Sequence, residues 1–452
     1  MKNANIVLLL VLILLLVNLI VTDQVLAIEK VDYNLQDIGQ KIEEFVDEHE
    51  ATTAGMSVAI FSAKETVYKN YFGYMNIEDQ VPVTEDTVME WGSVSKLLVW
   101  VSVMQLVEQG KIKLDEDVNT YLPAGFLKNR VYESSLTMLN LMNHNAGFED
   151  SILCMSTGHE DRIISIEEYL STFQPKQVYE PGKVVAYSNW GTTLAAYIVE
   201  NVSGMPYDDY VRKYIFEPLG MNDSTISPDL NDNKDVKERR KAVKSYSSDL
   251  KNTIPNIIYI VNYPSGSCVS TAVDLQKFAQ ALLSEDTVLF EHSATYHELF
   301  TPSLYYPNTE NPRNYHGFWV DGLYGTHVIG HGGNTIGFTS QLLLDFENGL
   351  GMVILNNQAM EVTYSQKMPT LLFGSYQGSR FDYNGLVKSS KTINHGPLKL
   401  YGLLSVRNIK SNDPNIPYGV ISDISGVDYL SMPYGDYRVI GIKDIAMDLI
   451  FF

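Results

Sequence analysis

Short apolar runs paired around polar turns mark two places in the chain where a β-hairpin is predicted. The first pair, residues 56–61 and 66–74, is separated by the turn-like tetrapeptide Ser-Ala-Lys-Glu. The second pair, residues 338–346 and 350–355, is separated by Glu-Asn-Gly, and an Asn-Gly pair is a strong signal for a tight hairpin turn. We therefore expect strands toward both ends of the folded part of the chain.

The stretch between these hairpins has the spacing of helices. Apolar residues over 97–107 recur at intervals of three and four, which predicts a helix that begins near Ser93 and stops at Gly110. Residues 136–225 also look mainly helical, with a further helix predicted over 192–202. Strands at both ends with helices between them predict an α+β fold.

The N-terminus has the pattern of a targeting segment. Lys2 is followed by a nearly unbroken apolar run over residues 6–21, then by a polar break and Ala27. This order is typical of a cleaved secretory signal peptide, and a retained membrane anchor is the alternative. In both cases we expect the catalytic part to lie outside the cytoplasm, secreted or associated with the cell envelope.

The C-terminal part differs in pattern from the rest. Beyond about residue 375 the chain is rich in Tyr and Gly and alternates only weakly between apolar and polar positions, which suggests a small β appendage. The predicted organisation is a signal peptide or anchor at 1–27, a catalytic domain at 28–375 and a β-rich extension at 376–452.

Composition narrows the classes of partner. The 452-residue chain has 33 basic and 54 acidic side chains, a formal charge of −21, which repels the phosphates of nucleic acid and an anionic membrane surface. We therefore expect a small-molecule or peptide substrate, no nucleic acid, and membrane contact only through an uncleaved N-terminal segment. Cys154 and Cys268 are the only cysteines, and a single bridge and two free thiols both stay open. No His-Glu-x-x-His helix occurs, and we expect neither a metal nor a cofactor.

The first candidate for chemistry is Ser93-Val-Ser-Lys96, at the predicted start of the apolar helix. Three-residue spacing places the serine and the lysine on one face, a turn apart. A serine hydroxyl is a poor nucleophile until a base takes its proton, and a lysine can do so when burial or a neighbouring cation keeps it neutral. The pattern recurs at Ser248 to Lys251, within residues 227–251, which we interpret as a solvated surface excursion without a catalytic role.

Tyr187-Ser-Asn189 is the second candidate. It follows a Pro-Gly turn and stands just ahead of a predicted helix, where a polar turn can point into a cleft. A phenol near a lysine can relay a proton, and an amide side chain can orient a substrate. The same Tyr-x-Asn spacing occurs at Tyr68, Tyr74 and Tyr306, where a strand face or a loop explains it.

The third candidate is His331-Gly-Gly333, at the start of the late strand region. Glycines there let a substrate approach the backbone closely, and strand N–H groups can bind an oxyanion. We predict that the N–H groups of Ser93 and Asn334 form that pair. A glycine bulge beside a packed histidine is the structural alternative.

Taken in order, the motifs at Ser93, Tyr187 and His331 resemble those of the serine β-lactamase and penicillin-binding protein superfamily, in particular its class C-like branch. The resemblance covers roughly residues 37–358. Four further stretches look like landmarks of the superfamily: residues 90–96, 136–148, 216–221 and 270–275.

The resemblance implies an antiparallel sheet built from both chain ends, packed against helices, with a helical subdomain as the other wall of the cleft. It also implies acylation of Ser93, followed by hydrolysis or transfer. Lys96 would be the general base, Tyr187 a proton relay, and Asn189 would touch the substrate amide. The third motif departs from the Lys-Thr-Gly of β-lactamases and D-alanyl peptidases, because His331 replaces the lysine that helps to bind a substrate carboxylate.

The leading hypothesis is therefore an extracytoplasmic serine hydrolase that acts on a peptide, a D-amino-acid amide or an ester. A β-lactamase or D-Ala-D-Ala carboxypeptidase is the alternative enzyme, and its discriminating lysine is absent. A weakly catalytic binding protein of the cell envelope is the alternative outside enzymes. An α/β-hydrolase is disfavoured because the chain has no Gly-x-Ser-x-Gly elbow.

Overall fold

The structure is a computed structural model. It describes residues 35–150, 155–252, 256–285, 288–305, 310–321, 323–324 and 327–374, together with the backbone of five strands between residues 386 and 440. The helices of the described residues are α2 (Ile38–His49), α3 (Lys96–Glu108), α4 (Met138–Met142), α5 (Ile166–Thr172), α6 (Asn189–Ser203), α7 (Tyr207–Val211), α8 (Lys234–Ala242), α9 (Ala272–Leu283), α10 (Ser293–Leu299) and α11 (Thr370–Phe373).

One large sheet joins the two ends of the catalytic region, and its neighbouring strands all pair antiparallel. Its order is β3-β2-β1-β14-β13-β12-β11-β10-β9. These strands are β1 (Gly55–Ser62), β2 (Thr66–Asn76), β3 (Val81–Pro82), β9 (Leu304–Tyr305), β10 (Pro312–Tyr315), β11 (Phe318–Val320), β12 (Val328–Asn334), β13 (Thr339–Asp345) and β14 (Leu350–Asn356). Both predicted hairpins, β1–β2 and β13–β14, are confirmed.

The strands β1 and β14, which join the N-terminal and C-terminal parts of the sheet, are buried over almost their whole length. β1 pairs with β14 from Met56 opposite Asn356 to Ser62 opposite Leu350. Nearly every residue of both strands is inaccessible to solvent, and α9 packs against both of them. Near-continuous apolar runs of this kind suit strands whose two faces are both covered.

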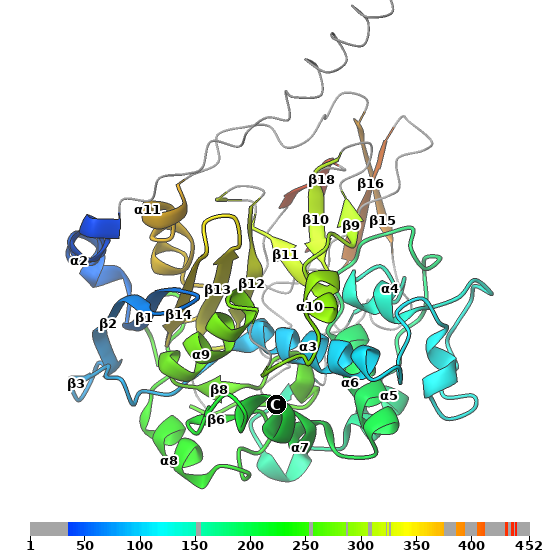
Figure 1. The fold of residues 1–452 in the computed structure, drawn as a ribbon, viewed down its shortest axis with the longest axis horizontal. Coiled ribbons are helices and arrows are strands. Elements are labelled where there is room, and N and C mark those ends of the chain that lie inside the picture. The colour runs from blue at the N-terminus through cyan, green and yellow to red at the C-terminus, as the bar shows by residue number, and fades with distance from the viewer. Residues whose placement is uncertain are drawn as a thin grey trace, which may run out of the picture. The chain divides into compact units, whose positions relative to one another are not determined.

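Helix α3 lies in the interior and positions the first motif. It runs beside α6 below the sheet (Figure 1) and contacts α6 and α10. Every residue from Lys96 to Leu106 is buried, so the helix is covered on all sides, as an apolar sequence without a polar face requires. The prediction of a helix beginning near Ser93 is confirmed. Gly110, with φ +68°, follows its end.

Five further short strands pair in two small sheets. They form β4 (Met89–Glu90), β6 (Ser224–Thr225) and β8 (Val269–Ser270) in one small sheet, and β5 (Ser156–Thr157) and β7 (Tyr259–Ile260) in another. The large antiparallel sheet and the flanking helices confirm the α+β prediction.

The C-terminal stretch contains five strands in the described backbone. They are β15 (Leu386–Ile393), β16 (Ser405–Ser411), β17 (Leu430–Met432), β18 (Gly435–Tyr437) and β19 (Val439–Ile440), in sheets of order β15-β16-β19 and β17-β18. The division at about residue 375 stays a prediction. The predicted signal or anchor, residues 1–27, and Cys154 lie outside the described residues, whereas Cys268 is a free, buried thiol.

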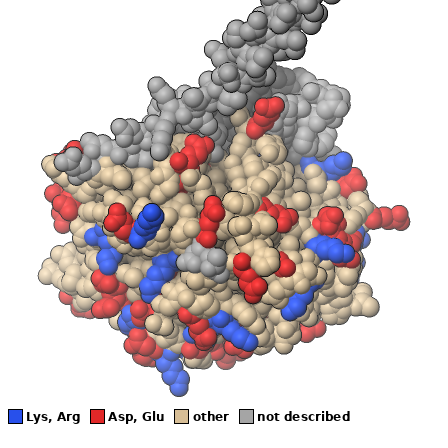
Figure 2. All heavy atoms as spheres, in the orientation of Figure 1, with Lys and Arg blue, Asp and Glu red and all other residues tan. Residues whose placement is uncertain are grey.

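Among the described residues, no helix is long and apolar enough to cross a membrane. Charges of both signs are interspersed over the described part of the face in Figure 2, and acidic side chains outnumber basic ones in the sequence.

Candidate active site

Ser93 lies in a 3-10 turn, η3 (Gly92–Ser95), that runs directly into α3. The lysine of the motif, Lys96, is the first residue of that helix, and its Nζ lies 3.0 Å from Ser93 Oγ. The turn is held against the sheet, because Ser340 Oγ of β13 donates to the carbonyl of Trp91 over 2.5 Å. The predicted pairing of serine and lysine on one face is therefore present.

Two further acceptors surround the Lys96 amine. Nζ donates to Asn189 Oδ1 over 2.7 Å and to the Ser265 carbonyl over 2.6 Å. A neutral amine has two N–H groups and one lone pair, and these two oxygens can only accept. They occupy both N–H groups of the neutral amine, so its lone pair is left for the hydroxyl hydrogen of Ser93.

Burial sets the protonation of that amine. Lys96 has no solvent exposure, and desolvation lowers its pKa to about 7, against a smaller upward effect of the Asp150 charge. A lysine with such a pKa is substantially neutral at physiological pH. The neutral state that a general base needs is therefore accessible without a metal or a second cation.

Asn189 stands between Lys96 and the carboxylate of Asp150. Asp150 accepts from the Asn189 side-chain Nδ2 over 2.8 Å and from the backbone N–H groups of Asn189 and Trp190, each over 3.1 Å. The carboxylate fixes the amide orientation, so that Oδ1 faces Lys96. Burial raises the pKa of Asp150. Both ends of the predicted substrate-binding amide are thus engaged by neighbouring side chains.

The helix that positions Asn189 begins earlier than predicted. α6 starts at Asn189 rather than at residue 192, because Ser188 caps it: the Ser188 hydroxyl accepts from the Gly191 N–H over 2.9 Å. Tyr187 immediately precedes this cap, so its place just ahead of a helix is confirmed. Asn189 itself belongs to the first turn of the helix.

The Tyr187 ring completes the wall around Lys96. Lys96 Nζ lies 4.9 Å from the centroid of the Tyr187 ring, and the same ring stacks on His144, with centroids 4.5 Å apart and planes 20° apart. His331 lies at the edge of this cluster, 6.0 Å from Tyr187 between centroids. The second and third predicted motifs are therefore brought to the first.

The two histidines beside Tyr187 have opposite tautomers. His144 Nδ1 must accept, because its partner over 3.0 Å is the Ser188 N–H, whereas His331 Nδ1 must donate, because its partner over 2.6 Å is the Gly332 carbonyl. Burial and the nearby Lys96 charge lower the pKa of His331 to about 3 and hold that of His144 well below its usual range. Both rings are therefore neutral at physiological pH.

The third motif presents a strand edge to the nucleophile. β11 pairs with β12 only at Ile329 and Gly330, so the β12 edge from His331 to Asn334 is left to face the turn that contains Ser93. A side chain at position 333 would place its Cβ 3.0 Å from the Ser93 nitrogen and 2.0 Å from the Trp91 carbonyl. Glycine at position 333 is thus required for this close approach.

Gly92, in the turn that contains Ser93, also allows the close approach of this turn to β12. Its φ is +51°, and a Cβ there would lie 2.8 Å from the Asn334 nitrogen. The backbone nitrogens of Ser93 and Asn334 are therefore held on adjoining segments. The structure brings together all seven predicted site residues: Ser93, Lys96, Tyr187, Asn189, His331, Gly333 and Asn334.

One prediction about the surroundings is wrong. Residues 227–251 are not simply a solvated excursion, because they contain α8, whose Arg240 is 1% exposed and ion-paired with Glu90 over 2.7 Å. The exposed Ser248 confirms that the second Ser-x-x-Lys copy is a surface feature.

Among the residues that the structure describes, no group of three or more His, Cys, Asp or Glu could hold a metal ion.

Sequence reasoning gave no role to three groups of the site. Asp150 has no local signature, and the Ser265 contact is made by a main-chain carbonyl, which no residue type encodes. His144 lies within the landmark stretch 136–148, which the sequence had singled out. Nothing in the sequence predicted that its ring stacks on Tyr187.

The family model named Beta-lactamase matches residues 38–374. The chain belongs to the Beta-lactamase family. It is a serine hydrolase of the β-lactamase-related type, as the motifs at Ser93, Tyr187 and His331 predicted. The serine β-lactamase and penicillin-binding protein superfamily is confirmed as its wider group, and the class C-like branch stays a prediction.

Curated members of this group are similar over much of the catalytic region. Penicillin-binding protein 4* of Bacillus subtilis is 24% identical over 67% of this chain and 68% of its own length. The D-alanyl-D-alanine-carboxypeptidase/endopeptidase AmpH of Escherichia coli is 28% identical over 51% of this chain and 58% of its own length. The match therefore spans between about half and two thirds of these proteins.

A solved structure shows the same Beta-lactamase fold. The D-amino acid amidase from Ochrobactrum anthropi SV3, complexed with D-phenylalanine, superposes with a TM-score of 0.59 and 24% identity, covering 75% of this chain and 97% of the amidase. This likeness supports the fold.

Proposed function

We propose that this protein is an extracytoplasmic serine hydrolase that cleaves a peptide, a D-amino-acid amide or an ester through an acyl-enzyme on Ser93. The observation that carries the proposal is the Lys96 amine. Its two neutral-state N–H groups are taken by Asn189 Oδ1 and the Ser265 carbonyl, and its third position is 3.0 Å from Ser93 Oγ. This arrangement supports proton transfer from Ser93 to Lys96 as the serine attacks.

The remaining groups supply the other parts of acyl transfer. The backbone nitrogens of Ser93 and Asn334 would bind the oxygen on which negative charge develops, and each such donor typically contributes about 3 kcal/mol in the transition state. Tyr187, adjoining Lys96, would return a proton to the leaving group. The free edge of β12 would align an extended substrate by main-chain hydrogen bonds.

His331 supports a substrate without a required carboxylate. With Nδ1 donating to the Gly332 carbonyl and a pKa of about 3, the ring is neutral and its Nε2 can only accept. A substrate carboxylate gains no attraction from such a group, whereas a donor does. The name of the D-amino acid amidase among the similar structures agrees with an amide substrate.

The relatives favour one alternative, a β-lactamase or a D-Ala-D-Ala carboxypeptidase. Both curated relatives are named for penicillin binding or for D-alanyl-D-alanine cleavage. In this chain, the neutral His331 occupies the position at which β-lactamases and D-alanyl peptidases carry the carboxylate-binding lysine. The location outside the cytoplasm rests on the apolar segment at residues 6–21 and on those names.

The test is the intact mass of the purified protein after treatment with a fluorophosphonate, which phosphonylates an activated serine. We expect one adduct, which is lost in Ser93→Ala and kept in Ser248→Ala, the matched serine of the exposed Ser-x-x-Lys copy. Adduct formation that survives in Ser93→Ala would contradict the assignment of the nucleophile.

A parallel treatment with benzylpenicillin separates the enzyme classes. Fluorophosphonate labelling without a stable penicillin adduct or penicillin hydrolysis would favour the esterase or peptidase. A stable or turned-over penicillin adduct on Ser93 would favour the alternative. A protein that takes up neither reagent would instead be a binding protein of the cell envelope.

A further inference from the structure

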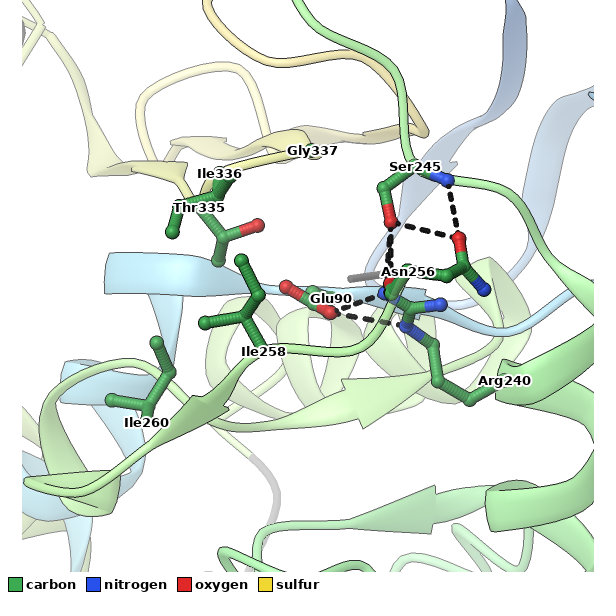
Figure 3. A pocket seen from close by; sticks show the side chains of 9 residues that line it. All are labelled: Glu90, Arg240, Ser245, Asn256, Ile258, Ile260, Thr335, Ile336 and Gly337. Atoms are coloured by element: carbon green, nitrogen blue, oxygen red, sulfur yellow. Dashed lines mark hydrogen bonds and ion pairs between the residues drawn. The ribbon is translucent and has the colours of Figure 1, made fainter. Parts of the chain in front are cut away.

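A small pocket adjoins the site on the side of Asn334. Its enclosed space holds about one water-sized group, and its lining comes from four separate parts of the chain. Figure 3 shows the lining residues, which are Glu90, Arg240, Ser245, Asn256, Ile258, Ile260, Thr335, Ile336 and Gly337.

The pocket begins within a short reach of the reacting atoms. Thr335 directly follows Asn334, and Glu90 precedes Ser93 by three residues, which span at most about 11 Å of chain. A substrate whose carbonyl lies between Ser93 and Asn334 would therefore lie close to this pocket.

Most polar groups of the lining are already satisfied within the chain. Arg240 donates to Glu90 Oε1 through Nε and Nη2 and to carbonyls of Val243 and Asn256, and its guanidinium stacks 4.4 Å from the centroid of Phe338. At most one of its five N–H groups is left over. Arg240 is thus unavailable as a receptor for an anion.

Two oxygens are left facing the pocket. Glu90 is 9% exposed and uses only Oε1 toward Arg240; Oε2 has no hydrogen-bond partner among the described residues and points away from Arg240, toward Ile258 (Figure 3). Thr335 Oγ1 is buried and likewise has no partner in the described part of the chain. The negative end of the Glu90–Arg240 pair therefore faces the pocket.

The remaining walls are apolar. Ile258, Ile260 and Ile336 are each partly exposed and line the pocket. A carboxylate oxygen and a hydroxyl, with aliphatic side chains among the other lining residues, match a primary ammonium on an aliphatic stem. An anionic group would meet Glu90 Oε2 and be repelled.

We propose that this pocket is a subsite for an ammonium group of the substrate, with Glu90 Oε2 and Thr335 Oγ1 as its acceptors. The proposal rests on the proposed function for its link to catalysis, and it narrows the substrate class to amides or esters whose acyl part carries an ammonium at the end of an aliphatic side chain. The binding itself requires no turnover, so it is testable separately.

The test is an NMR titration of the purified protein at 0.15 M NaCl with three probes of equal chain length: butylammonium, 1-butanol and butyrate. We expect butylammonium to bind at least about tenfold more tightly than 1-butanol, because its contact with Glu90 is charge-assisted, and butyrate to bind most weakly. Equal affinity of butylammonium and 1-butanol, or no measurable butylammonium binding, would overturn the proposal.

Two variants locate the binding. Thr335→Val keeps the side-chain shape and leaves the Glu90–Arg240 pair intact, and we expect it to weaken butylammonium binding several-fold. The matched control is Thr370→Val, at the start of α11 and outside the pocket lining. Glu90→Gln should weaken binding further where the variant folds. Parent-like affinity in Thr335→Val would mean that the ammonium binds elsewhere.

A kinetic comparison then connects the subsite to catalysis. The p-nitroanilides of D-lysine and D-norleucine differ only in the terminal ammonium, so the ratio of their kcat/KM values reports this contact. We expect a preference of about tenfold for D-lysine that falls in Thr335→Val. Cleavage of both substrates at equal rates would reject the subsite and leave the hydrolase standing. Failure to cleave either one, with ammonium binding intact, would leave the subsite standing and reject a D-amino-acid amide as the substrate.

Discussion

Lys96 and Arg240 are both buried basic side chains near a carboxylate, yet their surroundings give them opposite behaviour. Arg240 contacts Glu90 directly, with two hydrogen bonds of 2.7 and 3.0 Å to one carboxylate oxygen. Lys96 reaches Asp150 only through the amide of Asn189, and its direct hydrogen-bond partners are all neutral oxygens.

The difference shows how an amide placed between a buried basic side chain and a carboxylate changes the protonation of that side chain. A direct ion pair stabilises the charged form, so it suits the permanently charged guanidinium. An amide between amine and carboxylate keeps orientation while weakening the attraction, and desolvation then lowers the pKa of Lys96 to about 7. One arrangement holds a charge in place, and the other allows a proton to leave.

The largest effect is expected when the Arg240 chemistry is moved to Lys96. Lys96→Arg keeps a cation that cannot lose its proton, so Ser93 loses its base and fluorophosphonate labelling should slow by about a thousandfold. Rates come from intact mass against time. The control is Lys251→Arg in the exposed Ser-x-x-Lys copy, which should label like the parent. Labelling of Lys96→Arg within tenfold of the parent would show that another group takes the proton.

The second effect concerns the Arg240 side of the comparison. Glu90→Gln leaves a buried guanidinium without its counter-charge, so the free energy of unfolding should fall by about 3 kcal/mol or more. Urea denaturation measures it. The control is Glu238→Gln, which breaks the exposed ion pair with Lys241 on α8 and should cost less than about 1 kcal/mol. Equal losses in the two variants would remove the distinction drawn for the buried pair.

The smallest effect is a shift in pH dependence. Labelling should rise with pH through about 7, as Lys96 loses its proton. The Asp150 charge raises the pKa of Lys96, so Asp150→Asn should move the midpoint of this rise to lower pH. The measurement is the labelling rate across pH, with the exposed Asp249→Asn as control. A midpoint that stays in place or moves upward would show that the carboxylate does not act on Lys96 through Asn189.

The parts of the fold that the sequence allowed us to predict are those with local periodicity. The hairpins over β1–β2 and β13–β14 and the helix after Ser93 follow from apolar spacing and turn residues, and each is confirmed. The seven predicted site residues were identifiable because they belong to short motifs whose order resembles that of a known superfamily.

The parts that escaped prediction depend on contacts distant in sequence. α8 has the composition of a solvated helix, and nothing in it marks Arg240 as buried, because its partner Glu90 lies 150 residues away. The contact of Lys96 with the Ser265 carbonyl comes from the main chain and has no residue signature. Asp150 acts on Lys96 only through the orientation of Asn189, which spacing alone does not encode.

The complete burial of Lys96 also links the protonation of the protein to its thermodynamic stability. The amine has a pKa near 10.5 when exposed and of about 7 in the fold, so between these values the unfolded chain binds one proton more than the folded chain. Stability therefore rises with pH across this window and falls as pH drops toward 7, where the cost of burying the charged amine is fully present. The residue proposed as the base for Ser93 thus makes the folded state less stable in acidic surroundings.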